Sequence, residues 1–81
     1  MKYKILLFAH LREIFGSPEV ELEFDSEITG TDLLDQLETL KPEISVQKKY
    51  LKISVNGEYA TLDQPIESGS EVAVFPPVSG G

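Results

Sequence analysis

The sequence contains no cysteine and a single histidine. The absence of cysteine excludes disulfide bonds and a thiolate nucleophile, and it removes most zinc-binding ligand sets. His10 has no second histidine or carboxylate pair near it in the sequence, so we expect no metal site. The stability of the fold must therefore come from the packing of apolar side chains.

Long apolar runs and positive charge are also scarce. No run approaches the roughly 20 residues that a membrane-spanning helix needs, and the N-terminus lacks a signal-peptide layout. We therefore expect a cytoplasmic protein with no membrane partner. Seven Lys and Arg stand against 14 Asp and Glu, which gives a net charge of −7. Such a surface repels nucleic-acid phosphates and suits a partner with a basic face, although solubility alone would also explain it.

Two stretches near the N-terminus alternate between apolar and polar residues, as β-strands do. The first covers residues 2–9, and its predicted inward side chains are Tyr3, Ile5, Leu7 and Ala9. Its other face ends in Leu6 and Phe8, which are either covered by a loop or exposed to a partner. The second covers residues 20–24, and its predicted inward side chains are Val20, Leu22 and Phe24. A short helical turn over residues 10–15 is expected between them, ended by a glycine.

The main helix is predicted from Thr29 to Leu40. Thr29 and Asp32 have the spacing of a capping box, with aspartate in the acidic position. The sequence Lys41-Pro42 is expected to end the helix, because proline disfavours helical geometry in the residue before it. The predicted apolar stripe consists of Leu33, Leu34, Leu37 and Leu40.

The C-terminal half contains three further predicted strands. Residues 51–55 are followed by Asn56-Gly57, the strongest short signal for a hairpin, and by a return strand over residues 58–60. Residues 72–75 form the last strand, with Val72 and Val74 on one face and Ala73 and Phe75 on the other. The predicted loops are a weakly patterned loop with a turn of helix over residues 43–50, and turns at residues 63–65 and 67–70.

This order predicts an α+β protein with a mixed sheet of four or five strands packed on one main helix, which is the β-grasp or ubiquitin-like fold. The first and last strands can be parallel neighbours because the helix supplies a crossover. Residues 1–75 would form the domain and residues 76–81 an extended, reactive C-terminal tail. Phe8 and Phe75 would form an exposed aromatic pair on the sheet face opposite the helix, beside the tail, and would bind a partner.

The tail is the six-residue sequence Pro76-Pro77-Val78-Ser79-Gly80-Gly81. Proline has no backbone N–H and cannot continue a sheet, so the tail should leave the domain as an extended arm. At about 3 Å per residue it could reach on the order of 15–20 Å. Two glycines without Cβ atoms could enter a narrow channel and present the terminal carboxylate to an attacking group. A frayed end or a cloning remnant is the alternative interpretation.

Three segments together resemble the small subunit of molybdopterin synthase, the sulfur-carrier family of molybdenum-cofactor biosynthesis. They are residues 4–13, 55–59 and 69–81, with the sequences KILLFAHLRE, VNGEY and GSEVAVFPPVSGG. The final strand followed by Pro-Pro-Val-Ser-Gly-Gly is the most specific part. The chain departs from the family at Ser70, where aspartate is more common.

The resemblance implies a chemistry for the C-terminus. Gly81, next to Gly80, would be adenylated and then converted to a thiocarboxylate, the 1-thioglycine form. The thiocarboxylate would donate sulfur to cyclic pyranopterin monophosphate and form the molybdopterin dithiolene. This chain would bind no cofactor, because it has no glycine-rich loop that cradles phosphates. ATP would be consumed by a partner that adenylates the carboxylate.

The resemblance also implies the partners. These are the large subunit of molybdopterin synthase, which would hold the catalytic pocket in a heterotetramer, an adenylyltransferase that resembles ubiquitin-activating enzymes, and a sulfurtransferase or cysteine desulfurase as sulfur source. The implied partner-binding residues are Phe8, Arg12, Phe75, Pro76, Pro77, Val78 and Ser79.

Other functions share this architecture. A sulfur carrier of thiamine synthesis has the same fold and Gly-Gly end but lacks the Pro-Pro-Val-Ser approach. A ubiquitin-like modifier would join Gly81 to lysine side chains of other proteins. A β-grasp interaction module with an incidental tail would carry out no chemistry.

Overall fold

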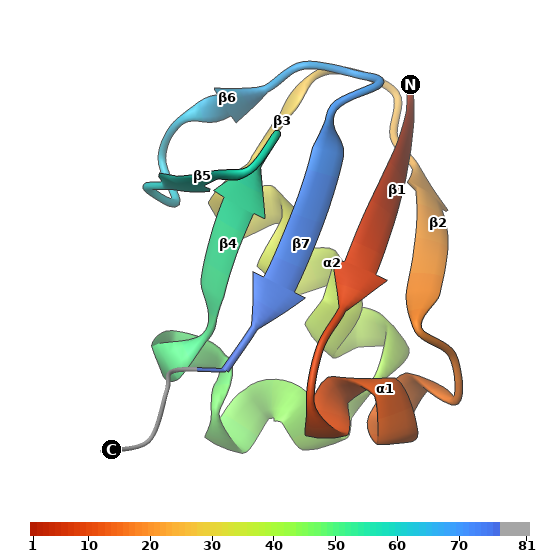
Figure 1. Cartoon of the computed structure of the whole chain (residues 1–81). Helices are drawn as coiled ribbons and strands as arrows, with labels where there is room; N and C mark the ends of the chain where they lie inside the picture. Colours follow the sequence, from red (N-terminus) through yellow and green to blue (C-terminus); the bar gives the residue numbers. More distant parts are fainter. Residues whose placement is uncertain (77–81) are drawn as a thin grey trace.

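The chain folds into a sheet with its main helix on one face, as a computed structural model that describes residues 1–76 shows (Figure 1). In chain order the elements are β1 (Lys2–Leu7), α1 (His10–Phe15), β2 (Glu19–Glu23), β3 (Ile28–Thr29), α2 (Gly30–Leu40), the 3₁₀ helices η1 (Pro42–Val46) and η2 (Lys48–Tyr50), β4 (Lys52–Val55), β5 (Glu58–Ala60), β6 (Pro65–Ile66) and β7 (Glu71–Phe75). Within residues 1–76, no helix is long and apolar enough to cross a membrane.

The larger sheet has five strands in the order β2-β1-β7-β4-β5. Its central pair, β1 and β7, is parallel, with Ile5 opposite Val72, and the other neighbours are antiparallel. In Figure 1 the helix α2 lies behind the sheet and the opposite sheet face points toward the viewer. The predicted mixed sheet over one main helix, with parallel first and last strands, is therefore confirmed.

The core lies between the sheet and α2. Alternate residues of the two central strands are buried in it, as predicted, and they are Tyr3, Ile5, Leu7, Val72 and Val74. Ala9, predicted to continue this row, is exposed. β1 ends at Leu7, and Ala9 has a φ of 56°, so the alternation stops two residues before it.

The helix α2 begins as its capping box predicts. The Thr29 hydroxyl accepts the Asp32 backbone N–H at 3.3 Å, and the Asp32 carboxylate accepts the Thr29 backbone N–H at 3.0 Å. The buried leucines of the helix are Leu33, Leu34 and Leu37. The prediction was wrong for Leu40, which is 47% exposed. The chain turns into η1 directly after Leu40, and the buried Ile44 of η1 joins the core there instead.

A second, two-stranded sheet was not predicted. β3 pairs with β6, and Ile28 lies opposite Ile66, with both side chains buried. Pro65, predicted to be in a turn, is in β6. The buried Tyr3 hydroxyl donates to the Ile66 carbonyl at 2.8 Å and so connects this small sheet to β1. Strands of two residues are too short to show a period, which is why the sequence pattern missed them.

Two predicted turns are confirmed by left-handed backbone angles. Asn56 and Gly57 have φ values of 53° and 86°, as a type I′ hairpin turn between β4 and β5 requires. The helix α1 ends at Phe15, and Gly16 follows it with a φ of 71°. The loop predicted over residues 43–50 consists mainly of the two 3₁₀ helices.

The exposure of Leu40 gives a direct test of the core boundary. We expect Leu37→Ala to lower the free energy of unfolding by about 2–5 kcal/mol, because it opens a cavity among buried side chains. Leu40→Ala is the matched control on the same helix and should cost less than about 1 kcal/mol. Urea denaturation followed by circular dichroism measures both, and equal losses would contradict the core boundary given above.

Candidate docking groove beside the C-terminal tail

The predicted site residues divide into two sets. Phe8, Arg12, Phe75 and Pro76 are described by the structure. The remaining predicted residues, Pro77, Val78, Ser79, Gly80 and Gly81, lie outside the described residues. The described residues therefore include the surface that adjoins Pro76, where the tail begins.

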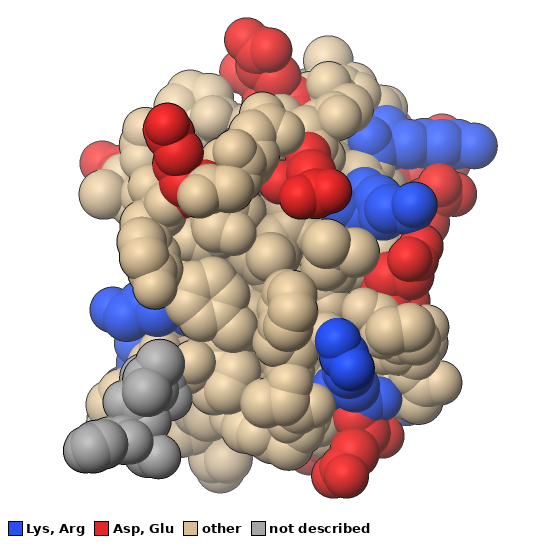
Figure 2. Space-filling view, in the orientation of Figure 1, with Lys and Arg blue, Asp and Glu red and all other residues tan. Residues whose placement is uncertain are grey.

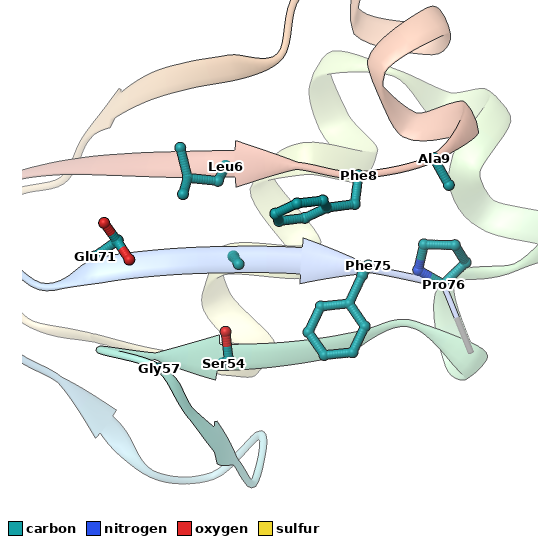
Figure 3. A pocket seen from close by; sticks show the side chains of 9 residues that line it. Leu6, Phe8, Ala9, Ser54, Gly57, Glu71, Phe75 and Pro76 are labelled. Carbon is teal, nitrogen blue, oxygen red and sulfur yellow. The ribbon is translucent and has the colours of Figure 1, made fainter. Parts of the chain in front are cut away.

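A shallow groove of about 550 Å³ lies on the sheet face opposite α2 (Figure 3). It is lined by Leu6, Phe8, Ala9, Ser54, Gly57, Glu71, Ala73, Phe75 and Pro76. Figure 3 shows the rings of Phe8 and Phe75 at the ends of neighbouring strands, with Pro76 directly after Phe75. Phe8, Phe75 and Pro76 therefore lie together at one groove, and partner binding by them stays a prediction.

The groove follows from the register of the three central strands. Ala73 in β7 lies opposite Leu6 in β1 and opposite Ser54 in β4. Ala73 and Ser54 have small side chains, so the middle of this face is low, whereas the aromatic rings stand at one end. The same alternation that buries Val72 and Val74 therefore produces the groove on the other face.

The two aromatic residues differ in exposure. Phe8 is 40% exposed, as predicted for a partner-binding side chain. Phe75 is partly buried and less exposed than Phe8, which corrects the expectation of two exposed rings. The Tyr59 ring covers part of Phe75, because the two rings form a T-shaped pair with centroids 5.6 Å apart.

Tyr59 is a member of this face that sequence reasoning missed. It lies in β5 directly opposite Ser54, so it continues the row of Leu6, Ala73 and Ser54 across the sheet. Its side chain is 80% exposed. The Asn56-Gly57 turn could have predicted the position of Tyr59, because a two-residue hairpin loop sets the pairing of the strands that it joins.

Arg12 contacts the Phe8 ring and the end of β1. Its Nε donates to the Leu7 carbonyl at 2.9 Å, and its guanidinium carbon lies 5.5 Å from the centre of the Phe8 ring. A guanidinium at this distance over a ring makes a cation–π contact. Arg12 therefore holds the end of β1 and the exposed ring together, and the Nε bond uses only one of its five N–H donors.

The backbone between Phe8 and the helix α1 is strained. Ala9 has φ 56° and ψ −139°, a conformation that residues with a Cβ rarely adopt. Backbone hydrogen bonds on both sides of Ala9 maintain this conformation. The Phe8 backbone N–H donates to the Val74 carbonyl at 3.3 Å, and the Arg12 backbone N–H donates to the Ala9 carbonyl at 3.1 Å. This turn directs the chain out of β1 and fixes the position of Phe8 at the groove.

The groove face carries little charge at its centre. Figure 2 shows a continuous uncharged area over the middle of the sheet, with acidic and basic side chains toward its edges. Within residues 1–76, no three His, Asp or Glu side chains are arranged to hold a metal ion. His10 instead contacts Gln47, with 2.5 Å between Nε2 and Oε1. An apolar surface with aromatic walls is suited to binding an apolar segment of another protein.

Comparison with known proteins agrees with this geometry. The sequence model of the ThiS family matches residues 5–81. A molybdopterin synthase sulfur carrier subunit from Dictyostelium discoideum is 37% identical over 99% of this chain and 96% of its own length. Small archaeal modifier protein 1 from Haloferax volcanii is 40% identical over 93% and 95%.

Similarity extends to solved structures. A putative molybdopterin converting factor, subunit 1, from Pyrococcus furiosus superposes with a TM-score of 0.85. It is 28% identical and covers 96% of this chain and 99% of its own. The shared fold therefore includes nearly the whole of both chains.

The strained turn predicts an unusual response to glycine. Ala9→Gly should raise the free energy of unfolding by about 1 kcal/mol, because glycine adopts positive φ without steric cost. The control Ala60→Gly, in the regular strand β5, should lower it by about 0.5–1 kcal/mol. Thermal and urea unfolding of both variants test the difference in sign, and destabilisation by both would show that Ala9 stores no strain.

Proposed function

This chain belongs to the ThiS family, and we propose from that premise that it is the sulfur carrier subunit of a molybdopterin synthase. The observation that carries the proposal is the similarity over nearly the full length to sulfur carrier subunits, together with the Pro-Pro-Val-Ser-Gly-Gly terminus. Residues 1–75 act as the docking domain and residues 76–81 as the reactive tail.

The proposed chemistry takes place at Gly81. A carboxylate is a poor electrophile, because neither of its oxygens is a good leaving group. Adenylation with ATP releases pyrophosphate and creates an acyl-adenylate. The terminal sulfur of a donor persulfide then displaces AMP, and a thiol cleaves the resulting acyl disulfide and leaves a thiocarboxylate. The sulfur of this group is a nucleophile that the chain obtains without any cysteine of its own. Transfer of that sulfur to cyclic pyranopterin monophosphate forms one half of the dithiolene.

The partners supply what this chain lacks in the proposal. The large subunit of molybdopterin synthase provides the catalytic pocket, in a heterotetramer of two small and two large subunits. An adenylyltransferase that resembles ubiquitin-activating enzymes binds ATP, and a sulfurtransferase or cysteine desulfurase provides sulfur. The reaction takes place in the cytoplasm. The groove supports this arrangement, because it offers an apolar docking surface next to Pro76, where the tail begins.

A second candidate function is protein modification, because a relative that is 40% identical is named as a small archaeal modifier protein. Both functions begin with an activated Gly81 and differ in what attacks it. Attack by sulfur gives a thiocarboxylate, whereas attack by a lysine amine gives an isopeptide bond. The thiamine-pathway carrier also begins with a thiocarboxylate, so only the acceptor of the sulfur distinguishes it.

Mass spectrometry of the protein isolated from its native host tests the proposal. We expect a C-terminal peptide whose mass is raised by the replacement of one oxygen with sulfur at Gly81. Deletion of Gly81 should abolish sulfur transfer in a reconstituted synthase, while circular dichroism and Tm stay unchanged because the core described within residues 1–76 is formed by side chains from Tyr3 to Val74. Lysine-linked adducts without any thiocarboxylate would favour the modifier function, and an acid that stays unmodified would refute both.

The groove gives an independent prediction about docking. Phe8→Ala should weaken binding to the large subunit by about 2 kcal/mol, the loss typical of a central aromatic side chain. It should change stability little, because Phe8 is 40% exposed. The matched control is Phe24→Ala, which removes a ring that packs at 5.8 Å against buried Tyr3. The control should lose stability and keep affinity, and isothermal titration calorimetry with urea unfolding measures both quantities. The reverse pattern would remove Phe8 from the interface.

A further inference from the structure

Positive charge is concentrated in one short segment of this acidic protein. Residues 41–52 contain Lys41, Lys48, Lys49 and Lys52 but only one acidic residue, Glu43. The segment therefore carries a charge of +3 in a chain whose net charge is −7. The remaining residues carry −10 in total. The segment is therefore opposite in charge to the rest of the chain.

The fold places this segment at the end of the sheet where the tail begins. Lys52 is the first residue of β4 and lies directly opposite Phe75 of β7. In β4 the side chains of Ile53 and Val55 turn toward the core, so Lys52 and Ser54 belong to the groove face. In Figure 1 the 3₁₀ helix η2 precedes β4 at this same end of the molecule, and Figure 2 shows basic side chains at the corresponding edge.

Lys48 connects this end to α2 at the surface of the fold. Its ammonium donates to Asp35, and to Glu38 at 3.0 Å. The hydrogen bonds to Asp35 and then Glu38 raise the pKa of Lys48 above its usual value. Lys48 therefore stays protonated and its charge is offset by two carboxylates of α2. Lys48 thereby connects η2 to α2, and the residues that follow it, Lys49 and Tyr50, are exposed.

Lys49 and Lys52 are the exposed lysines of this segment, in which Glu43 is also exposed. The Lys49 ammonium lies 5.2 Å from the centre of the Tyr50 ring, and Tyr50 is 53% exposed. Val46 in η1 is 80% exposed. We name Val46, Lys49, Tyr50 and Lys52 the basic end. Lys52 lies opposite Phe75 at the groove, and the other three residues lie in the two 3₁₀ helices that precede it in the chain. The rim of a protein interface is polar and solvent-accessible, and an exposed lysine beside an apolar groove suits such a rim.

The lysines at the other end of the groove face have carboxylates across the strand pairs. Lys2 lies opposite Glu23, and Lys4 lies opposite Glu21 in β2. Lys4 also lies 3.6 Å from the carboxylate of Glu19. Lys52, by contrast, lies opposite an uncharged ring. Positive charge without nearby acidic side chains on the same strands is therefore found at the tail end of the face.

We propose that the basic end docks against an acidic surface that surrounds the opening in the large subunit through which residues 77–81 enter. This inference rests on the proposed function and adds the partner chemistry to it. A partner surface of negative charge is repelled by most of this chain, whose remaining residues total −10. It is attracted to the basic end, so the charge pattern favours an orientation of the carrier with its tail toward the opening.

The same charge pattern argues against a nucleic acid as the occupant. A polyphosphate backbone extends beyond a patch formed by two lysines, and it would meet the acidic remainder of the surface. A folded acidic surface can instead match the patch in size. The apolar Tyr50 and Val46 also suit a protein surface better than a phosphate chain.

Matched charge reversals test this inference with the large subunit encoded in the same genome as the probe. Lys52→Glu and Lys2→Glu change the net charge equally, and both residues are exposed on the groove face but at opposite ends. We expect Lys52→Glu to lower the association rate constant about five- to tenfold at low salt, and Lys2→Glu less than about twofold. Lys52→Gln should have an intermediate effect, and circular dichroism checks that each variant is folded.

Salt supplies the second measurement. The difference between the two reversals should disappear at about 0.5 M NaCl, because screening removes interactions between exposed charges. Equal effects of both reversals, or faster association of Lys52→Glu, would overturn the inference while leaving the proposed function intact. If the wild-type chain fails to bind the large subunit at all, the proposed function fails, and this inference fails with it.

Discussion

The parallel pairing of β1 with β7 is the constraint on which the rest of the structure depends. It places the first and last strands of the chain side by side at the centre of the sheet, with Leu7 opposite Val74. Both strands run toward the same end, so Phe8 and Phe75 emerge together. A parallel pair cannot be closed by a tight turn, and the intervening α2 makes the crossover and covers the core face.

Side chains of a β-strand alternate between the two faces of the sheet, so the five residues of β7 contribute to both the core and the groove. In β7, Val72 and Val74 complete the core, whereas Ala73 and Phe75 form part of the groove. The core side chains hold the strand in place, and the groove side chains are free to meet a partner. A small domain without disulfides can in this way present an apolar groove directly before Pro76, where the C-terminal tail begins.

Charge adds a direction to this surface. The net charge of −7 suggested a partner with a basic face, but the structure separates the acidic body from the basic end. An apolar groove binds without strong orientation, whereas positive charge that is offset by carboxylates at one end and not at the other favours a single orientation. In the proposed complex, an apolar contact supplies affinity and a local electrostatic contact directs the tail.

The sequence by itself determined the features that depend on neighbours within a few residues. These include the capping box of Thr29 and Asp32, the Asn56-Gly57 turn and the alternation of the long strands. Only the tertiary structure decided that Leu40 is exposed and that Tyr59 and Lys52 flank Phe75. Local hydrogen bonds and side-chain periodicity depend on residues that are close together in the sequence, so a sequence pattern predicts them. Contacts between residues that are distant in the chain depend instead on how the strands pair and where the helix ends, so they come into existence only when the chain folds.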